Sequence, residues 1–442
     1  MGYIDNILFA VLLAVGFGFF ISNVKKLIRN IKLGQDVDRS DNKGERWANM
    51  ARVALGQSKM VKRPIAAILH IIVYVGFIII NIELLEIIID GLFGTHRVFA
   101  FMGTAYNVLI GAFEILAILV LVAVITFLVR RNIIKLKRFI HNDLKGWPKS
   151  DANYILYFEI VLMALFLLMN AADFTLQQRG APHFIQAGSF PVSQFVAPVF
   201  NSISTETLLI LERVFWWMHI AGILIFMNYL YFSKHLHILL AFPNTYFADL
   251  NPLGKFDNLE SVTKEVKLMM DPNADPFAAP AGDADAAPAK FGASDVQDLN
   301  WVQLLNAYTC TECGRCTSSC PANITGKKLS PRKIMMDTRD RLEEVGKNID
   351  ANKGVFVADN KTLLNDYITP EELWACTSCN ACVEECPVNI SPLSIIMDMR
   401  RYLVMEQSAA PMSLNAMMTN VENNGAPWQY SQQDRLNWKN EN

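Results

Sequence analysis

Two stretches decide the architecture of this chain: TCTECGRCTSSCPANI at residues 309–324 and ACTSCNACVEECPVNI at residues 375–390. Each has the spacing C-x2-C-x2-C-x3-C-P, and together they hold all 8 cysteines of the 442-residue sequence. Three thiolates at two-residue gaps fold around one corner of a cubic iron–sulfur cluster. The fourth, followed by proline, leaves in a new direction and ligates the other cluster. The spacing therefore predicts two [4Fe–4S] clusters that exchange their fourth ligands.

This exchange divides the cysteines into two sets. One cluster is predicted to take Cys310, Cys313, Cys316 and Cys386, and the other Cys376, Cys379, Cys382 and Cys320. Two zinc sites are the alternative, because zinc also accepts four thiolates, but zinc sites usually pair their cysteines as two separated CxxC units. A disulfide framework fits less well, because no cysteine lies outside the runs and the flanking loops are predicted to be cytoplasmic.

Five long apolar segments precede the cysteine runs. The sequence is 52% hydrophobic with a formal net charge of -2, too apolar for a purely soluble protein. Each segment is near or above the roughly 18–20 residues that a helix needs to cross the hydrocarbon of a bilayer. The predicted spans are residues 4–24, 64–89, 106–129, 154–172 and 208–232. We expect an all-α protein, a five-helix transmembrane bundle followed by a cytoplasmic α-helical ferredoxin domain.

Lysine and arginine give the expected orientation. Residues 25–63 carry 11 of them and residues 130–149 carry 7, whereas the other two loops hold only Arg97 and Arg179. The basic loops are predicted to be cytoplasmic. The N-terminus is then outside, and everything after Phe232 is inside the inner (cytoplasmic) membrane. The first span is not a signal peptide, because its positive charge follows the apolar run.

Composition divides the chain into three parts. We expect a transmembrane domain at residues 1–242, a connector and linker at 243–295, and a two-cluster domain at 296–442. Residues 271–295 are rich in Ala, Pro and Asp and predict a flexible linker. Residues 331–344 and 391–406 have helical spacing, which predicts a mostly helical C-terminal domain. A surface helix is also expected in the polar loop 34–57.

Histidines near the spans are candidate haem ligands. His219 and His237 are eighteen residues apart, so on one continuous helix they share a face at depths that differ by ~27 Å and cannot bind one haem together. His70 lies in the cytoplasmic half of the second span. Each histidine could simply anchor a helix end. Because a histidine within lipid is costly and usually functional, we expect at least one haem b.

The remaining histidines are assigned to loops or boundaries. His235 lies about 200° around the helix from His237 and is expected at the cytoplasmic boundary. His96, His183 and His141 are expected on the surface of the loops.

Carboxylates within spans are the other costly groups. Glu83, Glu86 and Asp90 cluster toward the outer end of the second span, with Glu114 and Glu159 inside the third and fourth. They either form hydrogen bonds within the bundle or exchange protons with a quinone. Near the cysteines, Arg315 and the Arg332–Lys333 pair either tune the cluster potential or simply solvate the surface, and surface solvation is the expectation.

Two stretches of the last span carry a family resemblance. WWMH at 216–219 and FSKHLH at 232–237 resemble the gamma subunit of respiratory nitrate reductase and the cytochrome b subunit of membrane-bound heterodisulfide reductase. The resemblance implies that His219 and His237 are haem ligands. It also implies that His70 shares the inner haem with His237. The second-helix ligand of an outer haem is replaced by Ile80, so His219 has no obvious partner.

The C-terminal part resembles a second family. The motifs CTECGRC at 310–316, LSPR at 329–332 and NNGAPW at 423–428 are similar to the two-cluster ferredoxin subunit of heterodisulfide reductase and of anaerobic glycerol-3-phosphate dehydrogenase. Those systems react at cysteine-rich CCG domains, on a separate chain or fused beyond the ferredoxin domain. All 8 cysteines here are already assigned, so we expect a partner to supply any catalytic thiol chemistry and assign no catalytic residue to this chain.

These features favour an electron-transfer subunit. Electrons are expected to pass between the quinone pool and a cytoplasmic CCG-domain or other redox subunit, by way of haem b and two [4Fe–4S] clusters. One alternative is a self-sufficient quinone oxidoreductase in which Glu83 or Glu86 moves protons. Another is a zinc-stabilised membrane scaffold without redox function. No nucleic-acid partner is expected.

Overall fold

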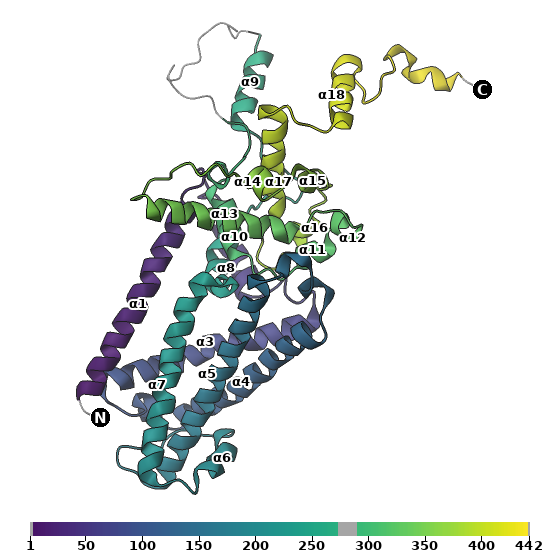
Figure 1. Cartoon of the computed structure of the whole chain (residues 1–442). Helices are drawn as coiled ribbons and strands as arrows, with labels where there is room; N and C mark the ends of the chain where they lie inside the picture. The colour runs from purple at the N-terminus through teal and green to yellow at the C-terminus, as the bar shows by residue number, and fades with distance from the viewer. Residues whose placement is uncertain (1–2, 273–289, 441–442) are drawn as a thin grey trace.

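The structure is a computed structural model that describes residues 3–272 and 290–440, and these form helices and loops (Figure 1). Five helices are long and apolar enough to cross a membrane, which confirms the predicted number of spans. Their bounds are α1 Tyr3–Ile31, α3 Pro64–Phe93, α4 Thr104–Leu128, α5 Trp147–Gln178 and α7 Thr205–Tyr229. The all-α prediction is therefore confirmed for the described residues.

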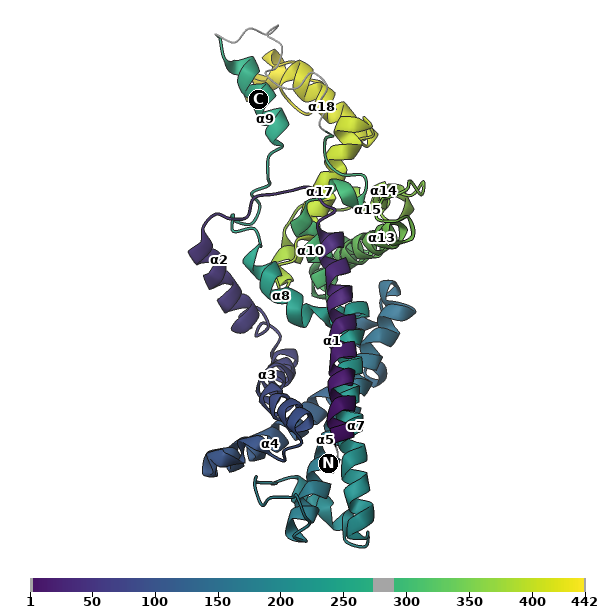
Figure 2. The same ribbon diagram turned by 90° about the vertical axis from the view of Figure 1, so that its left-hand side faces the viewer.

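The membrane bundle is built around α5. This helix packs against α7 and α4, while α3 packs on α4, and α1 contacts both α3 and α7. The shared core contains Phe9, Phe113 and Phe166, all fully buried. Figure 2 shows the α3–α4 pair leaning away from α5 and α7. Many apolar side chains of α1 and α3 face outward, as expected for helices that contact lipid.

The cysteine-containing domain sits on one end of the bundle (Figure 1). It is built from α10 Trp301–Thr309, α11 Arg315–Ser319, α12 Pro321–Ile324, α13 Pro331–Ala351, α15 Pro370–Trp374, α16 Ala381–Glu385 and α17 Pro392–Arg401. Helices α13 and α17 confirm the predicted helical stretches. In both, a serine caps the first turn directly before a proline: Ser330 accepts from the Lys333 N–H and Ser391 from the Ser394 N–H.

The C-terminal end of α1 projects beyond the bundle and packs into this domain. Leu27 and Ile31 join the same apolar core as residues of α10 and α13. The Asn30 amide donates to the Tyr308 hydroxyl at 2.9 Å, and the Gln35 N–H donates to the Leu299 carbonyl at 2.8 Å. The C-terminal end of α1 is therefore part of the core of the cysteine-containing domain.

A surface helix does form in the polar loop after α1. This helix, α2 Lys43–Met50, packs against α8 His237–Tyr246. The buried Arg46 donates to the carbonyls of Tyr246 and Ala248, and Asn49 donates to the Thr245 carbonyl at 2.6 Å. Helix α8 is thereby held against the end of the bundle.

The last span is not one helix through His237, which corrects the expectation from spacing. Helix α7 ends at Tyr229, and Ser233 is extended with φ -121° and ψ 150° before α8 begins at His237. The Ser233 hydroxyl accepts the His235 N–H at 3.1 Å, so a side chain replaces a helical backbone bond. His219 and His237 therefore belong to two different helices.

Two further helices extend from the domain, away from the bundle. Helices α9 Glu260–Met270 and α18 Met412–Asn424 protrude in both views (Figures 1 and 2). The flexible linker predicted at 271–295 falls mainly on residues 273–289, which lie outside the described residues.

Candidate redox-cofactor sites

One cavity brings together a predicted set of cysteines. It is lined by Cys310, Cys313 and Cys316 of the first run and by Cys386 of the second, with Cys382 at its edge. Apolar side chains such as Met335 and Ile390 form much of the remaining wall. The fourth cysteine around this cavity, Cys386, comes from the other run, which is the arrangement that an exchanged assignment requires. Four thiols around a common space fit an iron–sulfur cube.

Equivalent turns in the two runs produce this arrangement. Gly314 and Asn380 each follow the second cysteine of a run and have positive φ values of 71° and 59°. Each then starts a short helix, α11 or α16, and the two helices pack against each other. At Gly314 the close approach also excludes a side chain, because an added Cβ would lie 2.6 Å from the Arg332 guanidinium.

The second set lies nearer the solvent. Burial first, and then the neighbouring thiols of Cys376, Cys320 and Cys379, raise the pKa of Cys382 to about 12. These four cysteines are therefore close enough to interact electrostatically. Cys379 is exposed, whereas Cys320 and Cys382 are buried. Ligation by either set stays a prediction.

Burial keeps the free thiols of Cys310 and Cys386 neutral. It raises the pKa of Cys310 to about 12 and that of Cys386 to about 11. Binding of iron must therefore displace these protons and supply the charge that stabilises the thiolates. Backbone N–H groups already point at two sulfurs, from Ile390 to Cys386 Sγ at 3.3 Å and from Ser378 to Cys376 Sγ at 3.4 Å. Such N–H···S bonds tune cluster potentials.

The arginines near the first set are buried, which corrects the expectation of surface solvation. Arg315 is 3% exposed and donates to the Lys59 carbonyl at 3.1 Å, and Arg332 is 1% exposed and donates to the Arg138 carbonyl at 2.8 Å. Their acceptors lie in the basic loops of the membrane bundle. The first set is thus seated against the bundle with positive charge around it.

His70 and His237 face each other at this same end of the bundle. Their ring centroids are 6.4 Å apart. Two metal–imidazole bonds of about 2 Å each fit between rings at this separation. The His237 Nδ1–H donates to the Lys234 carbonyl at 3.1 Å, which leaves Nε2 free as a ligand. The buried His70 Nδ1 has no hydrogen-bond partner among the described residues. The pair therefore fits a bis-histidine haem.

The other candidate, His219, lies apart from this pair. It is 5% exposed on α7, and its ring contacts Phe166 on α5 at 6.0 Å between centroids. Its Nδ1 is buried without a partner among the described residues. No other histidine ring faces it in the described part of the chain, so the geometry supplies one ligand there and not two.

His235 is not a solvated boundary residue. Its Nε2 lies 3.7 Å from Glu159 Oε1, and its ring centroid is 5.4 Å from that of His237. Burial lowers the pKa of His235 to about 3, so the ring is neutral at physiological pH. The break at Ser233 turns this histidine inward, which a continuous helix would not have done.

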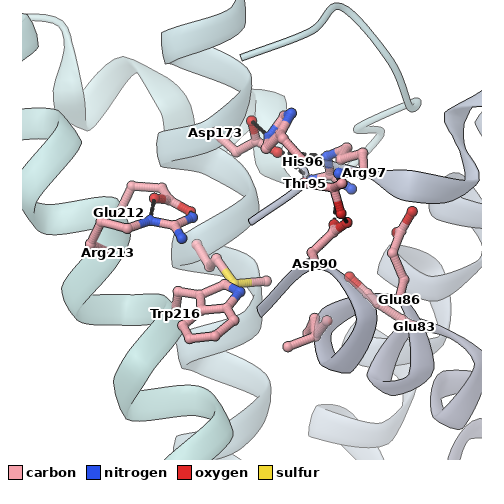
Figure 3. Close-up of a pocket in the computed structure, with 12 residues that line it drawn as sticks. Glu83, Glu86, Asp90, Thr95, His96, Arg97, Asp173, Glu212, Arg213 and Trp216 are labelled. Atoms are coloured by element: carbon pink, nitrogen blue, oxygen red, sulfur yellow. Dashed lines mark hydrogen bonds and ion pairs between the residues drawn. The ribbon is translucent and has the colours of Figure 1, made fainter. Parts of the chain in front are cut away.

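A third site, at the opposite end of the bundle, was only partly foreseen. Figure 3 shows a pocket between α3, α5, α7 and the loop after α3. The predicted carboxylates Glu83, Glu86 and Asp90 line it. Spacing did not identify its other polar members, which are Thr95, His96, Arg97, Asp173, Glu212 and Arg213. The charged ones could have been found in the sequence as charged residues within or beside apolar segments, as Glu212 and Arg213 are.

Ion pairs organise most of this pocket. Asp173 is paired with both Arg97 and His96, the latter at 3.2 Å, so His96 is not a surface residue. Arg97 also donates to the Tyr106 hydroxyl at 3.2 Å. Glu114, predicted inside the third span, accepts from the backbone N–H groups of Val192 and Ser193 nearby. Ion pairs with the buried Asp173 thus hold the histidine and the arginine of the loop after α3 against the bundle.

Known proteins resemble this chain along nearly its whole length. Residues 309–390 match the family described as 4Fe-4S dicluster domain. The chain carries an iron–sulfur dicluster domain. Among curated proteins, the chain is 30% identical to the "Probable iron-sulfur-binding oxidoreductase FadF" of Bacillus subtilis, over 99% of this chain and 61% of that protein. The "EtfAB:quinone oxidoreductase" of Syntrophomonas wolfei is 26% identical over 96% of this chain and 57% of its own length.

A shorter relative matches the dicluster part. It belongs to a "Ferredoxin/F(420)H(2)-dependent CoB-CoM heterodisulfide reductase" of Methanosarcina acetivorans and is 33% identical over 24% of this chain and 52% of that protein. No solved structure matches the chain. The chain spans about three fifths of the length of the first two relatives. The relatives are iron–sulfur oxidoreductases and heterodisulfide reductase components, which favours iron–sulfur clusters over the zinc alternative.

Proposed function

We propose that this chain carries electrons between membrane quinone and a cytoplasmic redox partner, through one haem b and two [4Fe–4S] clusters. The dicluster domain and the membrane helices support the general class of iron–sulfur electron transfer. The proposal adds the haem, the quinone and the side of the membrane. Haem and clusters supply one-electron chemistry when bound, and the protein supplies ligands, orientation and electrostatics.

One observation carries the proposal: the His70–His237 pair lies next to the first cysteine set. Helix α3 starts at Pro64, so His70 is about 9 Å along the helix from that start. Arg63, the residue directly before α3, forms an ion pair with Glu385 at 3.3 Å, and Glu385 is the neighbour of Cys386 in the sequence. The first turns of α3 and the Arg63–Glu385 ion pair thus join the residues proposed for the haem to those proposed for the first cluster. The exposure of Cys379 supports the second set as the one that a soluble partner approaches.

The partner follows from the orientation and from the relatives. Eleven basic residues in 25–63 and seven in 130–149 support a cytoplasmic location for the dicluster domain. The name of the Syntrophomonas relative supports EtfAB as a donor class, and the heterodisulfide reductase relative supports a CCG-domain protein. We propose one of these two as the partner.

The polar pocket favours a second candidate function. A self-sufficient quinone oxidoreductase needs a site where protons as well as electrons are exchanged, and the pocket around Glu83 supplies buried carboxylates for this. Turnover of quinol by the purified chain with an artificial electron acceptor, without any added protein, distinguishes this candidate from a dependent subunit.

A reduced-minus-oxidised absorption spectrum tests the haem. We expect a b-type band in membranes that contain the chain, lost with His70→Ala and with His237→Ala. His219→Ala should leave the band, because no second imidazole faces that residue. His141→Ala, a loop histidine about a third exposed, is the matched control. A band that survives both His70→Ala and His237→Ala contradicts the proposed ligands.

A further inference from the structure

The polar pocket at the end of the bundle opposite the dicluster domain has the features of a substrate site. It lies between the end of α3, the end of α5 and the beginning of α7, and the loop after α3 closes one side. Trp216, Met169 and Ile87 provide an apolar wall. A planar aromatic ring can stack on such a wall, while polar groups at the rim fix its oxygens.

Most charged groups of the pocket already have partners. The Asp90 carboxylate accepts from the Arg97 N–H at 2.7 Å and from the Thr95 hydroxyl at 2.5 Å. Glu86 accepts from the Phe99 N–H at 2.9 Å and from the Tyr106 hydroxyl at 2.8 Å. Glu212 is paired with Arg213, and Asp173 with Arg97 and His96.

Glu83 is different. It is 4% exposed, it lines the pocket, and its Oε2 has no hydrogen-bond partner among the described residues. Figure 3 shows its side chain reaching from α3 toward the side of the pocket that α7 forms. A carboxyl oxygen buried without a partner costs free energy, so its retention indicates that something else satisfies it in the working protein.

We propose that this pocket binds the quinone head group and that Glu83 exchanges a proton with it. This inference rests on the proposed function. In quinol oxidation, two O–H bonds break, two electrons leave one at a time for the haem and cluster chain, and two protons leave. Glu83 takes one of the protons, and the His96–Asp173 pair, which also lines the pocket, takes the other. Quinone reduction runs the same steps in reverse.

The location of the pocket also predicts the membrane face at which protons are exchanged. Glu83 is thirteen residues beyond His70 on α3, about 20 Å further from the dicluster domain. Protons exchanged there enter or leave by the membrane face opposite the clusters, past Asp90, Thr95 and His96. Electrons and protons therefore part at the quinone and move toward opposite faces.

Quinone turnover by Glu83→Gln tests the role. With purified full-length chain and a short-chain quinone plus an artificial one-electron donor, we expect turnover to fall about 100-fold, as for loss of a positioned proton-transfer group. Quenching of tryptophan fluorescence by the same quinone should still titrate within about threefold of the unmodified chain, because the pocket wall is intact. Glu206→Gln, an exposed carboxylate at the same end of the bundle, is the matched control.

The other outcomes separate this inference from the proposed function. Turnover by Glu83→Gln within twofold of the unmodified chain overturns the role of Glu83, and it leaves the proposed function intact if Cys386→Ser abolishes turnover. Unchanged fluorescence quenching and KM in Trp216→Leu place the quinone elsewhere. A chain that contains haem and clusters but neither oxidises quinol nor reduces quinone refutes both proposals. In sealed vesicles, a trapped pH dye that reports exchange on the dicluster side refutes the direction.

Discussion

The two cysteine runs have the same spacing and lie in different surroundings. The cavity of the first set is lined in part by the buried residues Arg315 and Arg332, whose guanidinium groups donate to carbonyls in the loops of the membrane bundle. The second set includes the exposed Cys379, whereas every cysteine of the first set is at least partly buried. The shared spacing of the cysteines therefore predicts the same type of cofactor in both sites. The surrounding residues make one site less accessible to solvent than the other. In the proposed route, the first set would exchange electrons with the membrane cofactors and the second with a soluble partner.

The largest effect is expected from a cysteine that belongs to one run and to the cavity of the other. Cys386→Ser should remove the cluster of the first set and lower the bound iron to about half, because each cubic cluster holds four irons. Iron analysis and electron paramagnetic resonance of the reduced protein measure this. Ser378→Ala, in the second run, should keep all iron. Loss of the second cluster in Cys386→Ser would show that the ligands are not exchanged.

The second-largest effect is expected at the proposed haem ligands, at the end of the membrane bundle next to the first cysteine set. His237→Ala should abolish the b-type band, whereas His235→Gln should keep it, because His235 faces Glu159 and not His70. Reduction of the clusters by dithionite should remain possible in both variants. If His235→Gln loses the band while His237→Ala retains it, the ligand assignment is wrong.

The contact between the first cysteine set and the membrane bundle depends on Asp143, which pairs with Arg332. Burial alone would raise the pKa of Asp143, but the hydrogen bond from Ser330 and the charge of Arg332 outweigh it and hold this pKa below its ordinary value. The pair therefore stabilises the fold above about pH 4, and this contribution is lost as the pH falls through the lowered pKa. Asp143→Asn should cost about 3 kcal/mol, as for a broken buried ion pair.

Urea titration of cluster absorbance measures that cost. The unmodified chain should lose stability below about pH 4 relative to neutral pH, and Asp143→Asn should show a smaller change over the same range. Glu371→Gln, which breaks the exposed pair with Lys328, is the control and should change stability by less than about 1 kcal/mol. Equal effects of the two substitutions would contradict a special role for Asp143.

The smallest effect concerns the charge around the first set. Arg315→Gln removes a buried positive charge, so it should lower the reduction potential of the membrane-side cluster. A unit charge at such range interacts by on the order of 1–2 kcal/mol, which is roughly 50–100 mV for one electron. Redox titration followed by electron paramagnetic resonance measures the shift. Lys327→Gln, an exposed charge, should leave both potentials within experimental error.

Local patterns predicted much of this molecule. The cysteine spacing placed four side chains of two runs around one cavity, and hydropathy located the five spans, because both signals are repeated over many residues. The break at Ser233 escaped prediction, because a single extended residue barely changes the hydropathy of a long segment. The ring of His237 faces that of His70 after this break, whereas the spacing argument had placed His237 on one continuous helix with His219. The role of the His70–His237 pair as haem ligands stays a prediction.

Side-chain surroundings were predicted less well. Arg315 and Arg332 look like surface residues in sequence because arginine is usually exposed. Their burial requires carbonyl and carboxylate acceptors from loops nearly 200 or more residues away, which no local pattern reports. The pairing of Asp173 with Arg97 and His96 has the same origin, because it joins a span to a distant loop.

The extension of α1 into the dicluster domain has a consequence for biogenesis. The end of α1 contributes Leu27, Asn30 and Ile31 to the core of the cysteine-containing domain. The residues that pack against them are translated some 270 positions later. The cofactor-bearing half cannot finish its interior until the first helix has been inserted. If the cysteine-containing domain is expressed without the membrane helices, the apolar surface that α1 normally covers should be exposed. The isolated domain should then aggregate or bind chaperones. Maturation then has an order, with insertion first and loading of iron afterwards.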